Sequence, residues 1–271
     1  MIASEFFNKT ESLEKISLAL AENRFCLYAQ PIVALQPDCD RQEFQTKRCF
    51  EHYEIYPDFK KQSEQFAASN IFLPDAENYN LMIEIDRWVI SNFLTNYKAY
   101  CEQQRQYKLK LPTKVYNINL SEASINSYQI DLFLQKQLES YTFPEKTICF
   151  AITESALLSN IERIIALIKS LKNLGCLIAL DNFGKEISSL NCLKKLSIDY
   201  LKIDGGLIKN IDNDAVDYAA VECLSHISQV MKIKTIAKDI EDQCTTTNLE
   251  KIGINYGQGQ AIAKSRPLSF I

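Results

Sequence analysis

Eight short apolar runs recur along the chain, and from residue 115 onward they alternate with stretches of helical period. The runs are FCLYAQ (25–30), CFEHYE (49–54), VYNINL (115–120), TICFAIT (147–153), LIALD (177–181), DYLKID (199–204), KTIAK (234–238) and NYGQ (255–258). Alternation of strand and helix predicts a parallel sheet with crossover helices. Eight such strands predict an α/β fold that closes as a (β/α)8 barrel.

Apolar residues recur at three- and four-residue intervals in the stretches 11–22, 81–100, 160–174 and 214–231, which predicts a helix in each. The dipeptide Pro74-Asp75 is typical of a helix start before the second stretch. Gly175 suits the position just after the third helix. Only about 18 residues separate the first two strand runs, without helical period, which favours an antiparallel pair at the start of the barrel.

The composition limits the class of protein. A length of 271 residues suits one α/β barrel, and no linker or low-complexity segment divides it, so we expect a single domain over 1–271 with a short N-terminal helix before the barrel. A net charge of −4 gives no general attraction to nucleic acid or an anionic membrane. Neither a signal peptide nor a membrane-spanning run is evident, and nine cysteines without a C-x-x-C pair suit a reducing cytoplasm.

A polar residue closes nearly every strand run, where a barrel builds its active face. The residues at these positions are Gln30, Glu54, Asn119, Ala151, Asp181, Lys202, Lys238 and Gln258. A two-metal phosphodiester site needs several carboxylate or amide oxygens. Glu54, Asn119 and Asp181 are such ligands, and Lys202 could steady the attacking water or the developing charge. Ala151 and Lys238 cannot contribute a metal-binding oxygen.

These motifs resemble, in order and approximate spacing, those of the EAL domain family of cyclic di-GMP phosphodiesterases. The match runs from about residue 12 to 269 and comprises LYAQPIVAL, HYEIY, NINLS, AITES, LDNFG, LKID, TIAKDIE and GQG…SRPL. The resemblance implies a modified TIM barrel with an antiparallel start. It also aligns Glu54 with the family's metal-binding glutamate, and Gln30, Gln258 and Pro267 with positions that contact the dinucleotide.

The chain departs from the family pattern at four positions. Ala151 and Lys238 stand where the resemblance places metal-ligating glutamates, and Asn182 stands where it places a second aspartate. Asp58 replaces an arginine that grips the dinucleotide phosphate, which exchanges a bidentate attraction for a repulsion. The loop after LDNF reads GKEISS, in a region that the family uses to couple metal binding to dimerisation.

These changes remove the negative charge of the expected metal cluster. Glu54 and Asp181 are balanced by Lys202 and Lys238, whereas the family pattern is strongly anionic. An ammonium about 4 Å from a dication costs about 8 kcal/mol at an effective dielectric constant near 20. We therefore expect no metal, no cofactor and no catalytic residue, with Glu54, Asn119, Asp181 and Lys202 as vestiges of a catalytic site.

Three hypotheses remain open at this point. The first is a catalytically inactive domain that serves as a regulatory or protein-interaction module, through an unknown protein partner or a homodimer. The second is a receptor that binds cyclic di-GMP without cleaving it. The third is a weak phosphodiesterase that uses Mg²⁺ or Mn²⁺ held by Glu54, Asn119 and Asp181. Neither nucleic acid nor a membrane is an expected partner.

Overall fold

The computed structural model describes residues 14, 16–22, 24–35, 52–59, 69–78, 80–108, 114–141, 143–186 and 190–270, and of residues 69–72 it describes the backbone alone. Residues 16–21 are helical, which agrees with the helix predicted before the barrel over the part that is described. Residues 38–48, between the first two strand runs, lie outside the described residues. The last three residues of GKEISS, 187–189, also lie outside them.

Eight strands close into a barrel, and a ninth is added at one edge. They are β1 (Phe25–Ala34), β2 (His52–Phe59), β3 (Val115–Leu120), β4 (Ile148–Thr153), β5 (Leu177–Phe183), β6 (Tyr200–Ile203), β7 (Lys234–Ala237), β8 (Tyr256–Gly257) and β9 (Arg266–Pro267). Neighbours from β2 to β8 are parallel, while β1 lies between β8 and β2 and is antiparallel to both. The predicted modified barrel with an antiparallel start is confirmed.

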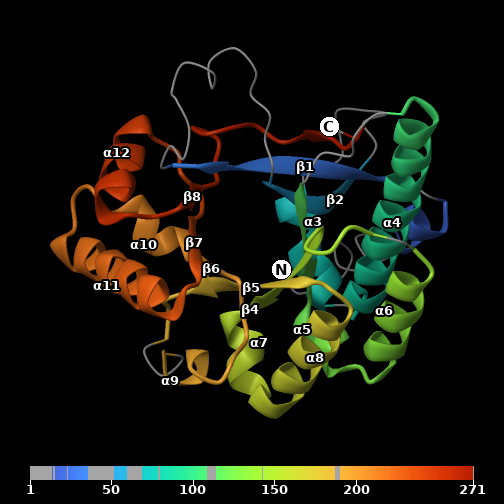
Figure 1. Ribbon diagram of the computed structural model, residues 1–271, viewed down its shortest axis with the longest axis horizontal. Helices are drawn as coiled ribbons and strands as arrows, with labels where there is room; N and C mark the ends of the chain where they lie inside the picture. The colour runs from blue at the N-terminus through green and yellow to red at the C-terminus, as the bar shows by residue number, and fades with distance from the viewer. Residues whose placement is uncertain are drawn as a thin grey trace, which may run out of the picture.

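Helices surround the ring of strands (Figure 1). They are α3 (Ser69–Asn78), α4 (Met82–Gln106), α5 (Glu122–Asn126), α6 (Gln129–Glu139), α7 (Glu154–Ser159), α8 (Ile161–Asn173), α9 (Leu190–Leu193), α10 (Gly205–Lys209), α11 (Ala215–Met231) and α12 (Gln243–Ile252). In Figure 1, α4 and α6 cover the right side of the barrel, α7 and α8 its lower side, and α10, α11 and α12 its left side.

Local sequence signals set the helix ends. The side chain of Asn160 accepts a hydrogen bond from the Arg163 N–H at the start of α8, and Asp214 caps α11 in the same way. Gly175 follows α8 with φ 79°, a left-handed conformation that glycine adopts at little cost, as predicted. The prediction that Pro74-Asp75 starts the helix after residue 80 is wrong, because Pro74 lies inside the separate helix α3.

The second strand is longer than its apolar run predicted. The run was expected to end at Glu54, but β2 continues to Phe59 because it pairs along its whole length with β1, from His52 opposite Ile32 to Phe59 opposite Phe25. Glu54 therefore lies within a strand rather than at its end. It is opposite Gln30 on one side and Asn117 on the other.

An apolar core fills the space between barrel and helices, and a second, small apolar cluster of Cys149, Ala151, Leu177 and Ala179 lies on β4 and β5. Alternate residues of a strand point to opposite faces of the sheet. Two residues of each of three strands therefore share the inner face of the barrel: 52 and 54 on β2, 117 and 119 on β3, and 200 and 202 on β6. In the part of the chain that is described, no helix is long and apolar enough to span a membrane.

Candidate functional site at the carboxyl end of the barrel

The buried carboxylate of Glu54 is occupied by three side-chain donors. Its Oε1 accepts a hydrogen bond from Asn119 Nδ2 at 2.8 Å. Its Oε2 accepts from Lys202 Nζ at 3.0 Å and from Gln258 Nε2 at 2.5 Å. Burial alone would raise the pKa of Glu54, but the Lys202 and Lys238 ammonium groups and the two amides hold it well below its usual range. Glu54 is therefore an ionised carboxylate with both oxygens engaged.

Asp181, the second carboxylate, is held between two lysines. Its Oδ1 accepts a hydrogen bond from Lys238 Nζ at 2.8 Å, and its Oδ2 lies 3.4 Å from Lys202 Nζ. Lys238 also donates to Asn182 Oδ1 at 2.6 Å. The Asn182 backbone N–H donates back to Asp181 Oδ1 at 2.7 Å. Lys238 therefore binds both polar residues of the LDNFG motif at once.

Lys202 links the two carboxylates. Its side chain is 0% exposed and forms ion pairs with both Glu54 and Asp181. Burial alone would lower the pKa of Lys202, but the two carboxylates outweigh it and raise the pKa above its ordinary value. Removing one partner from such a buried set of charges is strongly destabilising, because it leaves an uncompensated charge behind. Together with Lys238, which directly follows β7, these contacts link strands β2, β5 and β6 through one charge network.

Ala151 occupies the floor of this site. It lies opposite Asn119 on β3 and Ala179 on β5, and it is 1% exposed. Its methyl group belongs to the small apolar cluster on β4 and β5. Ala151 therefore contributes an apolar contact at a position where a glutamate would supply carboxylate oxygens for a metal ion.

The residues expected to contact a dinucleotide are partly brought together. Gln258 Nε2 donates to Gln30 Oε1 at 3.0 Å, and Gln30 Nε2 donates to the Ala263 carbonyl at 3.4 Å. Gln258 Oε1 is buried without a hydrogen-bond partner among the described residues. Pro267 is exposed on β9, where it pairs with Tyr28 of β1. It contributes to the edge of the same β1 strand rather than to the carboxylate cluster.

Asp58 lies near the far end of β2, opposite Cys26. Its Oδ1 accepts a hydrogen bond from the Phe59 N–H at 2.8 Å. Glu54 and Asp58 are four residues apart and so share one face of the strand. Their charges have the same sign, so this face of β2 is acidic where the resemblance placed an arginine.

One structural contact of the site was not predicted. Glu154, the acidic residue of AITES, is 2% exposed and accepts a hydrogen bond from the Lys185 N–H at 3.0 Å. Lys185 also forms an ion pair with Asp204 at 3.1 Å. These contacts fasten the segment after β5 to the starts of α7 and α10. The signal was present in the sequence as a charged residue within an otherwise apolar motif.

The set of side chains is poor in metal ligands. Among the described residues, no group of three or more histidine, cysteine, aspartate or glutamate side chains is placed to hold a metal ion. Each oxygen of Glu54 and Asp181 faces a nitrogen donor, and two of the donors are ammonium groups. The carboxylate oxygens of the cluster are thus paired with amide and ammonium groups of the same cluster.

Comparison with known proteins places these residues in a family. The EAL domain model matches residues 13–265. Cyclic di-GMP phosphodiesterase PdeB of Shewanella oneidensis is 33% identical over 255 residues, which is 94% of this chain and 28% of that protein. Cyclic di-GMP phosphodiesterase PdeF of Escherichia coli is 30% identical over 264 residues, 97% of this chain and 33% of that protein. The chain thus spans about a third of the length of these relatives.

Solved structures agree on the fold. The FimX EAL domain from Pseudomonas aeruginosa bound to c-di-GMP superposes with a TM-score of 0.77 at 23% identity. The comparison covers 94% of this chain and 96% of that one. The motif order, the barrel with its antiparallel first strand and the family match agree, and the chain belongs to the EAL domain family.

Proposed function

We propose that this EAL domain is catalytically silent and serves as a regulatory or protein-interaction module in cyclic di-GMP-related signalling. The observation that carries the proposal is the position of Lys238, whose ammonium contacts both Asp181 and Asn182. A lysine there takes up the carboxylate that a divalent ion would need. The same network leaves Glu54 saturated with donors.

The residues present do not fit a pair of divalent ions. Two carboxylates face two ammonium groups, so the cluster is close to neutral, and Ala151 supplies no oxygen. Mg²⁺ demands near-octahedral oxygen coordination and loses its water reluctantly. A cation about 4 Å from each lysine would meet a repulsion of about 8 kcal/mol per lysine at an effective dielectric constant near 20. No hydrolytic step is therefore assigned to this site.

The test is a hydrolysis assay on purified protein with cyclic di-GMP and either Mg²⁺ or Mn²⁺. We expect no turnover above that of the Glu54→Ala variant, which serves as the matched control. Turnover at an ordinary enzymatic rate that Glu54→Ala abolishes would refute the proposal. The relatives are named cyclic di-GMP phosphodiesterases, so a weak one-metal phosphodiesterase is a further alternative. A metal titration with product analysis would identify it.

A cyclic di-GMP receptor is the second candidate. The FimX EAL domain bound to c-di-GMP shares the fold, and Gln30 and Gln258 lie together at the mouth. Lys238 is 15% exposed at its side chain and could meet a phosphate, whereas Asp58 would repel one. Calorimetry with cyclic di-GMP in EDTA separates the two candidates. Heat of binding at tens of micromolar ligand would favour the receptor, and its absence would reject it.

The surroundings of the domain complete the proposal. We place the domain in the cytoplasm, since each cysteine that the structure describes is a free thiol and free thiols suit a reducing compartment. The residues at the barrel mouth do not indicate the chemistry of a protein partner. The homodimer stays a prediction. A partner surface therefore has to be sought elsewhere on the barrel.

A further inference from the structure

A groove lies on the side of the barrel away from the carboxylate cluster. It is bounded by the second half of α8 and by the segment 195–197 that leads into β6, and its volume is about 220 Å³. Because α8 ends just before β5 begins and the segment 195–197 just before β6 begins, the groove is at the amino ends of these strands. The site described above is at their carboxyl ends.

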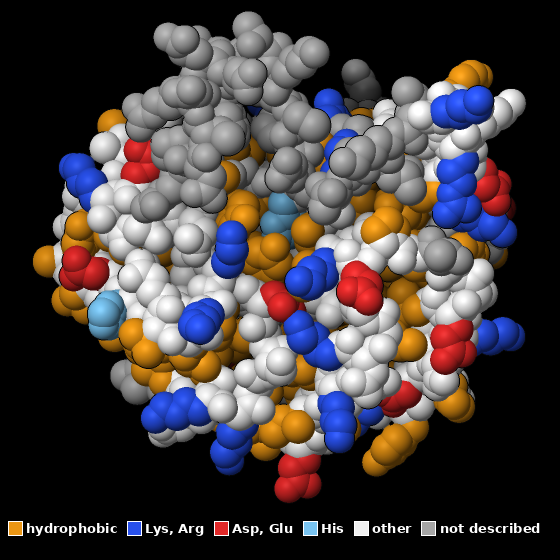
Figure 2. Space-filling view, in the orientation of Figure 1, with side chains coloured by type: hydrophobic (Ala, Val, Ile, Leu, Met, Phe, Trp, Pro, Cys, Tyr) orange, Lys and Arg blue, Asp and Glu red, His pale blue; other side chains and the backbone are white. Residues whose placement is uncertain are grey.

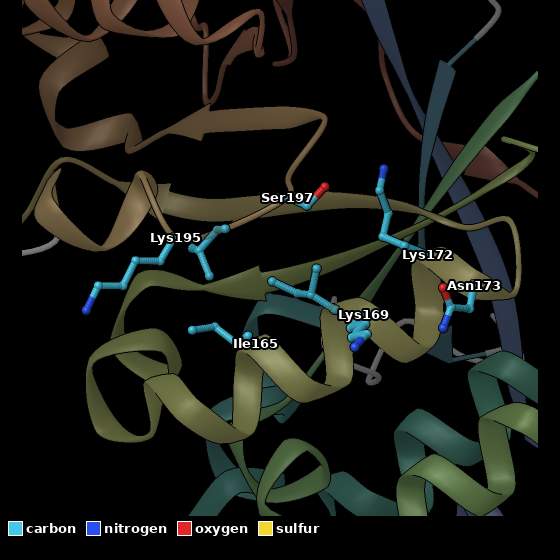
Figure 3. A pocket seen from close by; sticks show the side chains of 8 residues that line it. Ile165, Lys169, Lys172, Asn173, Lys195 and Ser197 are labelled. Carbon is cyan, nitrogen blue, oxygen red and sulfur yellow. The ribbon is translucent and has the colours of Figure 1, made fainter.

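The groove combines an apolar floor with a basic rim. Ile165, Ile168 and Leu196 form the apolar part, and Lys169, Lys172 and Lys195 are its charged residues. Figure 3 shows Ile165 and Lys169 on α8, and Lys195 and Ser197 on the segment across the space from it. The stretch from residue 165 to 173 is about 12 Å long at 1.5 Å per residue, enough for about four residues of an extended chain.

Only part of this positive charge is neutralised. Lys172 Nζ contacts both carboxylate oxygens of Asp199, at 2.8 and 2.7 Å. Lys169, Lys194 and Lys195 are exposed and have no acidic partner within the described ranges. Figure 2 shows several Lys and Arg side chains in the lower part of the view, with an acidic side chain at its lower edge. In a chain of net charge −4, this face is locally basic.

Two other cavities have less positive charge in their lining. The cavity between α4 and the segment 140–143 after α6 is lined by Lys98, Arg105 and Glu102, and Lys98 lies 4.0 Å from Glu102, so one of its two positive charges is balanced. The cavity between α4 and the C-terminal segment is lined without charged side chains, by residues such as Tyr100, Gln104 and Phe270. Of these three cavities, the groove beside α8 has the most positive charge, with three lysines and no acidic residue in its lining.

We propose that this groove docks an acidic segment of a partner protein, in which glutamate or aspartate alternates with bulky apolar residues. The apolar side chains pack on Ile165, Ile168 and Leu196, and the carboxylates pair with Lys169 and Lys195. This inference rests on the interaction role proposed above and names the chemistry of the partner. Charge complementarity sets the specificity and the on-rate, while the buried apolar contacts set the lifetime of the complex.

A nucleic acid fits the groove less well. Its lining has no aromatic ring on which a base could stack, and stacking is a principal source of single-strand binding. An isoleucine and leucine floor favours aliphatic or aromatic side chains of a peptide instead. The groove is also too short for the long phosphate track that duplex binding requires.

The probe is a short fluorescein-labelled peptide in which glutamate alternates with leucine, compared with the same peptide carrying lysine for glutamate. Fluorescence anisotropy should show binding of the acidic peptide alone, weakening as salt is raised. The variant Lys169→Glu/Lys195→Glu should lower the affinity at least about tenfold, because two attractive charges become repulsive. The matched control Lys136→Glu/Lys209→Glu makes the same charge change at exposed sites outside the groove and should bind as the wild type does.

A second variant, Ser197→Trp, fills the groove without changing its charge and should also lose the peptide. Amide chemical-shift changes on titration should fall on α8 and on residues 195–197. The proposal would be overturned if the groove variant and the control variant lost peptide affinity equally, or if Ser197→Trp bound the peptide as the wild type does. It would also be overturned if the chemical-shift changes were confined to another face. Binding of an oligonucleotide or of anionic vesicles at the groove, without binding of the acidic peptide, would also overturn the proposal.

The same wild-type preparation is assayed for cyclic di-GMP hydrolysis. Turnover would refute catalytic silence and leave the peptide result standing. Groove variants that still bind the peptide would refute the docking surface and leave catalytic silence standing. The two failures are therefore distinguishable.

Discussion

Restoring acidic groups at two positions should create metal affinity at the barrel mouth. In the variant Asn182→Asp/Lys238→Glu, the ammonium that lies 2.8 Å from Asp181 Oδ1 is replaced by a carboxylate, and a neighbouring amide becomes a second one. The cluster gains three units of negative charge. Asn182 has φ 54°, a left-handed conformation that aspartate also tolerates, so the backbone should accept the change.

The size of the effect follows from Coulomb's law. Each unit charge about 4 Å from a dication contributes about 8 kcal/mol at an effective dielectric constant near 20, so three units give about 25 kcal/mol before dehydration and competing contacts. If only a tenth of this survives, about 2.5 kcal/mol, the affinity rises about 60-fold. Calorimetric titration with Mn²⁺ should therefore show binding by the variant at concentrations where the wild type shows none.

A matched control separates the local effect from net charge. Lys169→Glu/Asn173→Asp makes the same change of charge on α8, at exposed residues on the opposite side of the barrel. It should leave Mn²⁺ affinity at the wild-type level. The reasoning is refuted if a folded Asn182→Asp/Lys238→Glu variant binds Mn²⁺ no better than the wild type, or if the α8 control gains affinity equally.

Two further predictions concern stability. Burial lowers the pKa of His52 to about 4 and raises that of Asp86 to about 6. Between about pH 4 and 6 the folded state thus binds fewer protons at His52 than the unfolded state, so His52 makes stability rise with pH, whereas Asp86 makes it fall. In urea unfolding, the slope of stability against pH should therefore be less positive for His52→Phe than for the wild type through this window, and equal slopes would contradict the assignment. A Cβ at Gly205 would lie 2.2 Å from Asp239 Oδ2, so Gly205→Ala should cost about 2 kcal/mol of unfolding free energy. Adding Asp239→Gly should recover most of this loss, and equal stability of the single and double variants would show that the clash is not the cause.

The sequence predicted most of the fold because its signals are local and redundant. The run VYNINL coincides with β3, and the period of residues 160–174 predicted α8 to within a residue at each end. The errors occurred where a non-local partner decides the structure. The length of β2 is set by its pairing with β1. Pro74 lies in the short helix α3, which the spacing of apolar residues did not predict.

For the site, the sequence indicated which residues meet but not how they pair. The charge balance set Lys202 and Lys238 against Glu54 and Asp181, but it did not indicate that Lys238 pairs with Asp181. Its simultaneous bond to Asn182 depends on the left-handed backbone at Asn182, which follows from the surrounding structure. The saturation of Glu54 by Gln258 and Asn119 likewise depends on side-chain directions from three different strands.

The central claim concerns whether the mouth of the barrel holds divalent ions. The most direct measurement is an anomalous diffraction experiment on crystals soaked with Mn²⁺ and cyclic di-GMP. The account predicts no manganese peak between Glu54 and Asp181, with the Lys238 ammonium still bound to Asp181. Two manganese peaks about 4 Å apart at that position, the spacing of a two-metal hydrolytic site, would contradict it.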